Sequence, residues 1–308
     1  MIPVLEIGGT HVTAALVSPR TAAVTARVRR PLDARGSAGD VLGAVLRCAR
    51  SLPSVPGARW GVAVPGPFDY AKGVALFAGV GKFESLYGTD VRAALLDGLP
   101  GSPPDVVFRN DAHAFLAGEW SAGAARGHAR AVGITLGTGV GSAFLADGGL
   151  RTSGAGVPPE GRLDLARIGG RPLEEVVSRR AILSRYGAAA GAGGGVPGDR
   201  APGGGAAGAG LDVREIAERA RAGEERACRV LATAFGALGA ELGPRLAAFG
   251  ATVLVVGGSM AESWDLLAPP LTAALAAEDR PPGAARRPVR ALLGEDAALV
   301  GAAAAAAA

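Results

Sequence analysis

The chain has 308 residues, a formal net charge of +4 and 49% hydrophobic residues, and only 5% of its residues are aromatic. This length predicts two domains or one large α/β unit, with a core built mainly from alanine, valine and leucine. The basic residues are scattered, which argues against nucleic-acid binding, and the two distant cysteines, Cys48 and Cys228, exclude a disulfide framework or a cysteine-rich zinc site.

The first half of the chain alternates strand and helix patterns. Residues 4–7 and 11–17 have strand patterns and are separated by a glycine turn, which predicts a hairpin. Apolar residues at helical spacing follow over 40–51, and a further strand is predicted at 60–64, before a Pro-Gly-Pro sequence. Alternation of this kind is typical of an α/β sheet.

The second half repeats the opening of the first. Strand patterns at 131–136 and 140–145 flank a Gly-Thr-Gly turn. Two glycine-threonine hairpins, each opening one half of the chain, predict two similar domains. We place an N-terminal α/β lobe at 1–114, completed by a C-terminal helix at 295–308, and a larger α/β lobe at 115–294.

Further segments follow along the second half. Residues 187–210 are nearly all Gly, Ala and Pro, which predicts a flexible surface loop. One or two amphipathic helices are expected over 211–243, followed by a buried strand at 252–256. The alanine-rich end, 296–308, favours a helix whose last residues fray.

The first residues, MIPVLEIGGTHV, begin at once with a strand pattern and lack a charged leader followed by a long apolar core. Apart from the weakly apolar alanines at the end, no apolar stretch approaches the roughly 18 residues that a membrane span needs. From the sequence we therefore expect a soluble, cytoplasmic protein with no membrane partner.

Three glycine-rich bends follow strands and suit phosphate binding. Such a bend leaves backbone N–H groups unobstructed, and a neighbouring threonine hydroxyl adds a donor. Each bend alone is more often an ordinary turn. Together they would contact both ends of a triphosphate and cradle its nucleoside. The candidate residues are Gly8, Gly9, Thr10, Gly137, Thr138, Gly139, Gly257 and Gly258.

The sequence NDAHAF, 110–115, follows an apolar run and places Asp111 directly after a strand. Asn110 and Asp111 are both preferred helix N-caps, and taken alone the residues favour a capping role. A general base is the other interpretation, because a kinase needs a carboxylate within reach of the acceptor hydroxyl. The three histidines, His11, His113 and His128, have no ligand spacing and are expected on the surface or in strands.

Taken together, these motifs resemble the ROK family of sugar kinases, relatives of hexokinase and actin. The strings that carry the resemblance are EIGGTHVTAALV, GVAVPGPFD, NDAHAFLAGE, GITLGTGVGSAFLADGGL, VVGGS and LLGEDAALVGAAAAA. The resemblance implies an α/β fold of two similar actin/hexokinase-like (ribonuclease H-like) lobes with a cleft between them. It also implies a homodimeric, ATP- and Mg²⁺-dependent kinase that phosphorylates a hydroxyl of a hexose or a related cyclic polyol.

The resemblance implies roles for individual residues as well. Asp111 is the expected general base, and Asn110 beside it is expected to hydrogen-bond the sugar. The glycine bends match ATP-binding segments, and Gly257 and Gly258 match the pair that lines the adenosine pocket. The remaining substrate-binding positions are Glu160, Glu174, Pro65 and Gly66, while Glu6 lies beside the expected magnesium hydration shell.

Three departures from the family pattern affect these expectations. The cysteine-rich zinc loop expected after Glu160 is absent, so we predict no structural zinc. Leu163 stands where the family has a sugar-contacting histidine, which indicates a rebuilt acceptor pocket. Glu6 replaces an aspartate, and its extra methylene shifts a carboxylate that helps to hold the magnesium shell.

The segment GVGKFESLYGTDV runs where the family has an acceptor-facing loop. It is either a solvated loop before a helix at 90–96 or a contact to the substrate. Lys82 within it is one of few lysines and could meet a phosphate or a polyol hydroxyl.

Three alternatives to a hexose kinase stay open. A cyclitol, or carbasugar, kinase of a biosynthetic pathway fits a rebuilt pocket. A sugar-responsive regulator is disfavoured, because a phosphate loop that begins at Glu6 leaves no room for a preceding helix-turn-helix. A non-catalytic sugar or nucleotide binder is opposed by Asp111 and both phosphate loops, but it is favoured by Glu6 and the missing zinc loop.

Overall fold

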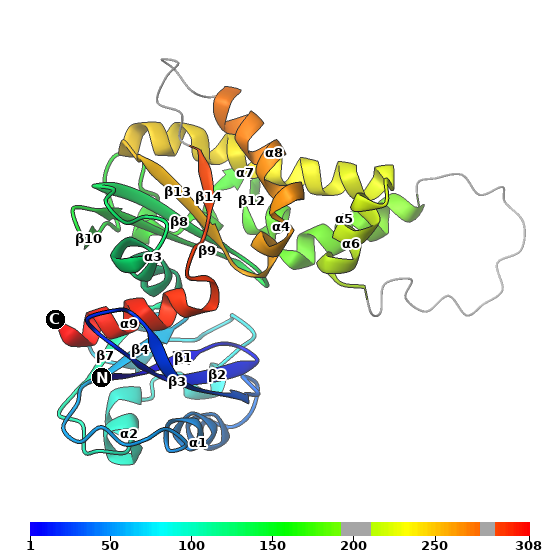
Figure 1. The fold of residues 1–308 in the computed structure, drawn as a ribbon. Helices are drawn as coiled ribbons and strands as arrows, with labels where there is room; N and C mark the ends of the chain where they lie inside the picture. The colour runs from blue at the N-terminus through cyan, green and yellow to red at the C-terminus, as the bar shows by residue number, and fades with distance from the viewer. Residues whose placement is uncertain (192–210, 278–286) are drawn as a thin grey trace, which may run out of the picture. The chain divides into compact units, whose positions relative to one another are not determined.

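The chain divides into two compact units, which the computed structural model describes over residues 1–191, 211–277 and 287–308 (Figure 1). The first unit comprises Met1–His128 and Ala291–Ala308, and the second comprises Ala129–Arg290. Each unit has a hydrophobic core of its own.

A five-stranded sheet forms the centre of the first unit, in the order β3-β2-β1-β4-β7. Strands β1, β2 and β3 are antiparallel neighbours, as the predicted hairpin requires, whereas β1, β4 and β7 run parallel. The interior strand β4 is buried at every residue, which is typical of a parallel strand covered on both faces. The bounds are β1 (Ile2–Ile7), β2 (His11–Val17), β3 (Val24–Pro31), β4 (Trp60–Val64) and β7 (Val106–Asn110).

Helices cover both faces of this sheet. Helices α1 (Ala38–Ala49) and α2 (Val91–Gly98) pack on one face, and α9 (Ala297–Ala307) packs on the other, with α3 (Asp111–Ala122) against it (Figure 1). Along the chain, β4 and α2 are separated by three short elements. These are the strands β5 (Phe68–Asp69) and β6 (Val74–Ala75) and a 3-10 turn at Glu84–Leu86.

The alanine-rich helix α9 is packed closely. It is buried along most of its length, including Ala306 near its end. A Cβ added at Gly118 of α3 would collide with the backbone of Ala297, and one added at Gly301 would collide with that of Ala114. Small residues therefore allow the two helices to pack this closely. The expected fraying of the last residues is not seen up to Ala306, which is buried and helical.

The second unit repeats the topology of the first. Its sheet has the order β10-β9-β8-β13-β14. Strands β8, β9 and β10 are antiparallel neighbours, and β8, β13 and β14 run parallel. This repetition confirms the predicted α/β fold of two similar units. The bounds are β8 (Arg130–Leu136), β9 (Val140–Ala146), β10 (Gly149–Leu150), β13 (Val253–Gly257) and β14 (Pro288–Arg290).

Helices and a short hairpin complete the second unit. The pattern over 211–243 forms two helices, α6 (Val213–Arg221) and α7 (Glu225–Phe249), and the second ends at a left-handed Gly250. None of the helices in the described ranges is both long enough and apolar enough to cross a membrane. The other elements are α4 (Glu174–Val177), α5 (Arg179–Gly191), α8 (Trp264–Ala277), β11 (Arg167–Ile168) and β12 (Arg171–Pro172).

Three predicted boundaries differ from the structure. A division after residue 114 would cut α3, whereas the first unit continues to His128 because α3 packs on α9. The predicted loop 187–210 begins too early, since 187–191 continue helix α5, as their alanines favour; residues 192–210 lie outside the described part. The C-terminal helix starts at Ala297, after a 3-10 turn.

Candidate functional site

The parallel strands of the first unit end at one edge of its sheet, and predicted site residues follow each of them. Gly8 follows β1, Pro65 follows β4 and Asp111 follows β7. The ends of the last two strands are level, because Val64 pairs with Asn110. Since ligands bind outside the carboxyl ends of parallel strands, this edge is the candidate site of the unit.

The first glycine loop joins β1 to β2 and keeps two backbone donors unused. The N–H of Gly8 donates to the carbonyl of His11 at 2.8 Å and closes the hairpin. For the N–H groups of Gly9 and Thr10, the described part of the chain provides no hydrogen-bond acceptor. Adjacent unpaired N–H groups at a glycine bend make the kind of concavity that binds a phosphate.

Asn110, the residue before Asp111, caps helix α3. Its Oδ1 accepts hydrogen bonds from the N–H groups of Ala112 at 3.0 Å and His113 at 3.2 Å. Asp111 is the first residue of the helix, and its Oδ1 accepts from Ala112 at 2.8 Å. Asn110 is therefore the N-cap, since it binds the N–H groups of both Ala112 and His113, whereas Asp111 binds that of Ala112 alone.

Asn110 is also joined to a residue that sequence reasoning missed. Its Nδ2 donates to Tyr70 Oη at 3.0 Å, and a Cβ on Gly66 would lie 3.2 Å from the same oxygen. Gly66, Tyr70 and Asn110 thus form a polar cluster beyond the end of β4. With its oxygen on the cap and one amide hydrogen on Tyr70, Asn110 keeps at most one donor for a ligand.

Two carboxyl groups at this edge have raised pKa values. Burial raises the pKa of Asp111, and the N–H of Ala112 and the ammonium of Lys82 partly oppose that rise. The pKa of Glu6 is raised to about 7, first because of burial and second because of the negative charge of Asp111. Raised pKa values make both groups stronger bases, and a bound cation would relieve the repulsion between them.

The second unit has an equivalent sheet edge built mainly from backbone. The loop 137–139 follows β8, and Gly257 ends β13, the parallel neighbour of β8. A Cβ on the first glycine of that loop would lie 3.7 Å from Ser259 Oγ, so the two bends are adjacent. Gly258 has a φ of 83°, and a Cβ there would collide with the backbone of Leu136. Only glycine fits this position.

The two glutamates expected to bind sugar lie in the second unit. Glu174 begins α4 and packs against the glycine loop, with Oε1 2.6 Å from the position of a Cβ on Gly139. Glu160 is exposed and has a left-handed backbone with φ 58°, a strained conformation that clusters at functional sites. The pKa of Arg162 is raised by a hydrogen bond to Asp164 and further by the negative charges of both glutamates, so both carboxylates act on the same guanidinium.

Leu163 belongs to the hydrophobic core. Its side chain is fully buried among the core residues of the second unit. Ser142 fixes its backbone, because the Leu163 N–H donates to Ser142 Oγ at 2.9 Å and that hydroxyl donates to the Gly161 carbonyl at 2.6 Å. The leucine that stands in place of the family's histidine therefore packs in the core of the second unit. Of this departure from the family pattern, only the missing sugar-contacting histidine still bears on the acceptor.

Comparison with known proteins places the chain in a family. A sequence profile of the ROK family matches residues 3–308. The chain belongs to the ROK family. The ROK hexokinase from Thermus thermophilus is 25% identical with a TM-score of 0.74, over 99% of this chain and 97% of that one. A ROK family glucokinase from Streptomyces griseus, solved with glucose and AMPPNP, is 24% identical with a TM-score of 0.77, over 98% and 97%.

A curated relative matches part of this ROK protein. The glucokinase of Thermotoga maritima is 29% identical over 158 residues, which is 51% of this chain. The match spans 48% of that relative, about half its length.

In this ROK protein a glycine hairpin stands where the zinc loop of the family was expected. Strands β11 and β12 pair around Gly169 and Gly170, whose φ values of 56° and 81° suit a tight hairpin turn. Across the described ranges, no three His, Cys, Asp or Glu side chains are grouped so that they could hold a metal ion. Backbone pairing thus holds this segment, and the lack of a structural zinc stays a prediction.

Proposed function

We propose that this protein is an ATP- and Mg²⁺-dependent kinase that transfers a phosphoryl group to a hydroxyl of a hexose or a related cyclic polyol. The observation that carries the proposal is the division of roles at the start of α3. Asn110 supplies the main cap, so the half-buried Asp111 carboxyl, with its raised pKa, is available for chemistry. Membership of the ROK family and the likeness to a hexokinase support the same activity.

Asp111 acts as the general base in this proposal. It takes the proton of the acceptor hydroxyl as the acceptor oxygen attacks the transferred phosphorus. Its raised pKa strengthens it as a base. Proton transfer of this kind contributes roughly 10²- to 10⁴-fold to the rate.

Backbone donors bind the phosphate chain of ATP. The unused N–H groups of Gly9 and Thr10 suit phosphate oxygens, which supports the first glycine loop as one contact. The 137–139 loop is the second contact, and the Gly257-Gly258 bend takes the nucleoside. Phosphoryl transfer depends chiefly on such positioning and on charge neutralisation.

Glu6 suits a place in the hydration shell of a magnesium ion. Glu6 has a pKa raised to about 7 by burial and by the charge of Asp111, so a hydrated cation nearby would favour its ionised form. Glu6 would hold a water of the hydration shell. Bound magnesium supplies neutralisation of the phosphate charge.

The acceptor contacts we propose are Pro65, Gly66, Asn110, Glu160 and Glu174. A cyclitol is the main alternative to a hexose, because the sugar-contacting histidine is missing. We also propose that the protein works in the cytoplasm as a homodimer. Size-exclusion chromatography with light scattering tests the dimer.

The decisive experiment measures acceptor-dependent ADP release with Mg·ATP across hexoses, amino sugars and carbocyclic polyols. Asp111→Asn is expected to lower kcat about 10²- to 10⁴-fold and to leave ATP binding intact. Asp40→Asn is the matched control, because Asp40 also stands in the first turn of a helix, α1, yet is exposed. It is expected to keep full turnover.

Two outcomes contradict the proposal. ATP binding without turnover on any acceptor would indicate a non-catalytic binder. Turnover that survives in Asp111→Asn would assign the base elsewhere.

A further inference from the structure

Lys82 is unusual because the chain uses arginine almost everywhere else. The sequence has two lysines among its 32 basic residues. The other, Lys72, is highly exposed, and its Nζ lies 3.5 Å from Oδ2 of Asp69. Lys82 is half-buried, and within the described ranges it forms no ion pair at 4.0 Å or less. A lysine is a compact charge with three donors on a flexible stem, whereas arginine is a planar fork.

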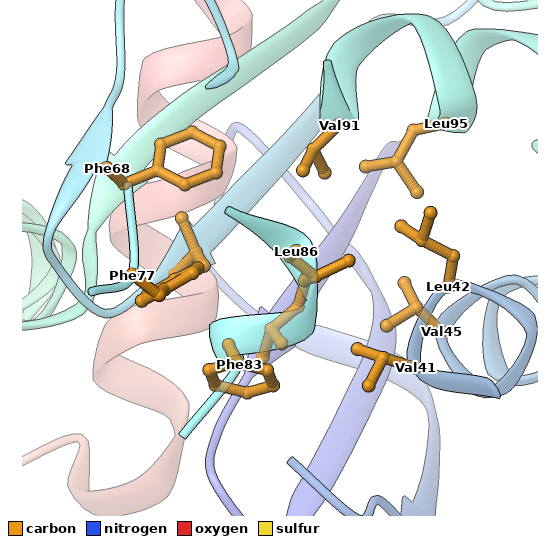
Figure 2. Close-up of a pocket in the computed structure, with 11 residues that line it drawn as sticks. Val41, Leu42, Val45, Phe68, Phe77, Phe83, Leu86, Val91 and Leu95 are labelled. Carbon is orange, nitrogen blue, oxygen red and sulfur yellow. The ribbon is translucent and has the colours of Figure 1, made fainter. Parts of the chain in front are cut away.

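The residue after Lys82 anchors its loop. Phe83 is 1% exposed, and its N–H donates to the carbonyl of Ala34 at 2.6 Å. Its ring lines an apolar pocket that Figure 2 shows together with Phe77 and Leu86, and the Phe77 and Phe83 ring centroids are 5.1 Å apart. The stem of Lys82 therefore starts from a fixed point in the core of the first unit.

From this anchor the Lys82 side chain reaches the first glycine loop. Its Cδ lies 3.9 Å from the position that a Cβ on Gly9 would take. Its positive charge also acts on Asp111, where it lowers the pKa against the effect of burial. Lys82 thus lies near both the proposed base and the unused N–H groups of Gly9 and Thr10.

We propose that Lys82 is a catalytic residue whose ammonium contacts the phosphoryl group during its transfer to the acceptor. This inference rests on the proposed kinase activity and adds a residue to it. The acceptor oxygen forms a bond to the γ-phosphorus, and the bond from that phosphorus to the β–γ bridging oxygen breaks, with its electron pair leaving on ADP. The acceptor proton goes to Asp111. Lys82 keeps its protons and neutralises charge on the phosphoryl oxygens.

Lysine suits this position better than arginine. A guanidinium beside Asp111 would bind its carboxylate through two parallel hydrogen bonds and hold it away from the acceptor. An ammonium on a flexible stem can leave the carboxylate and follow the phosphoryl group. Lys82→Arg is therefore expected to lower kcat although the charge is kept.

The test compares nucleotide binding by calorimetry in wild type, Lys82→Met and the control Lys72→Met. Lys82→Met is expected to weaken Mg·AMPPNP binding about ten- to a hundredfold, because a charge-assisted hydrogen bond is lost. Binding of Mg·ADP, which lacks the γ-phosphoryl group, is expected to change less than twofold, and Lys72→Met to change neither. In turnover assays, added methylammonium is expected to restore part of the activity of Lys82→Ala. Such a rescue would not occur if Lys82 had only a structural role.

The outcomes separate this inference from the proposed function. A wild-type protein that turns over an acceptor, with equal losses for AMPPNP and ADP in Lys82→Met and no rescue, would overturn the role of Lys82 alone. A wild-type protein that binds neither nucleotide would overturn both. Lys82→Gln, which keeps a polar but uncharged group at the end of the side chain, replaces the Met variant if thermal unfolding shows that Met destabilises the loop.

Discussion

The sheet edges of the two units have the same topology but different chemistry. In the first unit, the residues at the edge include the carboxyls of Glu6 and Asp111, with the ammonium of Lys82 acting on Asp111. In the second, the two bends at the edge are mainly glycine backbone, and Gly258 is required by close packing on β8. We infer that the first copy of the repeated fold carries the proton chemistry, whereas both copies contribute backbone donors to nucleotide binding.

The largest expected effect separates turnover from stability at the start of α3. Asp111→Asn is expected to lower kcat about 10²- to 10⁴-fold while the free energy of unfolding is unchanged or higher, because the variant removes a carboxylate that burial disfavours. Asn110→Ala removes the cap on Ala112 and His113 and is expected to cost about 1 kcal/mol of stability. Steady-state kinetics and urea unfolding of both variants measure the contrast. Equal stability losses would return Asp111 to the capping role.

The second effect concerns the other end of α3. Glu119 is fully buried, and its carboxylate accepts hydrogen bonds from the N–H groups of Ala124 at 2.7 Å, Leu292 at 3.1 Å and Leu293 at 2.8 Å. Those donors lie on the two segments by which the chain leaves and re-enters the first unit. Glu119→Gln places an amide N–H₂ against backbone donors and is expected to cost about 2–3 kcal/mol.

Urea unfolding measures the cost of Glu119→Gln. Glu225→Gln is the control, because Glu225 is 86% exposed and pairs with Arg229 on the surface of α7. Such a pair contributes at most about 0.5 kcal/mol. A change of that small size in Glu119→Gln would show that the buried hydrogen bonds do not hold α3 in place.

The third effect distinguishes two uses of glycine. Gly258→Ala forces a side chain into a left-handed conformation against the Leu136 backbone and is expected to cost about 2 kcal/mol or more. Gly9→Ala meets only Lys82 Cδ at 3.9 Å, so stability should be nearly unchanged while ATP affinity falls. Thermal unfolding and calorimetric titration of both variants measure the two effects. A Gly9→Ala protein that binds ATP normally would argue against the first loop as a phosphate site.

Local patterns predicted much of the fold. Glycine turns between apolar runs placed the hairpins at 8–10 and 137–139 correctly, because backbone conformation there depends on neighbouring residues. Contacts between distant segments could not be predicted in this way. Tyr70 meets Asn110 only because β4 and β7 pair, and Leu163 is buried by packing that its own sequence neighbourhood does not specify.

In the candidate site, too, features set by neighbouring residues could be predicted, whereas contacts between distant segments could not. That either Asn110 or Asp111 caps α3 followed from residue preference, but which of them does so depends on the backbone angles where β7 ends. The placement of Glu174 against Gly139 depends on how α4 packs on the loop after β8. Residue types therefore predict candidate chemistry, and the sheet register decides which candidates meet.

The smallest expected effect is a pH dependence of stability at the first edge. His113 lies in the first turns of α3 rather than in a strand, and burial, followed by the charge of Arg109, lowers its pKa from 6.5 to about 4. The unfolded chain therefore binds a proton as the pH falls below about 6.5 while the folded chain does not, so stability falls between pH 6.5 and 4. After a discount for its partial exposure, we expect a loss of about 1 kcal/mol between pH 7 and 5.

Urea unfolding at pH 7 and pH 5 isolates this contribution when wild type is compared with His113→Gln. The difference between the two pH values should be about 1 kcal/mol smaller in the variant, because glutamine has no proton to gain. His11→Gln is the control, since it removes an exposed histidine from β2. If His113→Gln loses as much stability as wild type between pH 7 and pH 5, the imidazole of the wild type is hydrated in the folded chain. The start of α3 would then be less desolvated than the raised pKa of Asp111 requires, which would weaken the contrast between the two sheet edges.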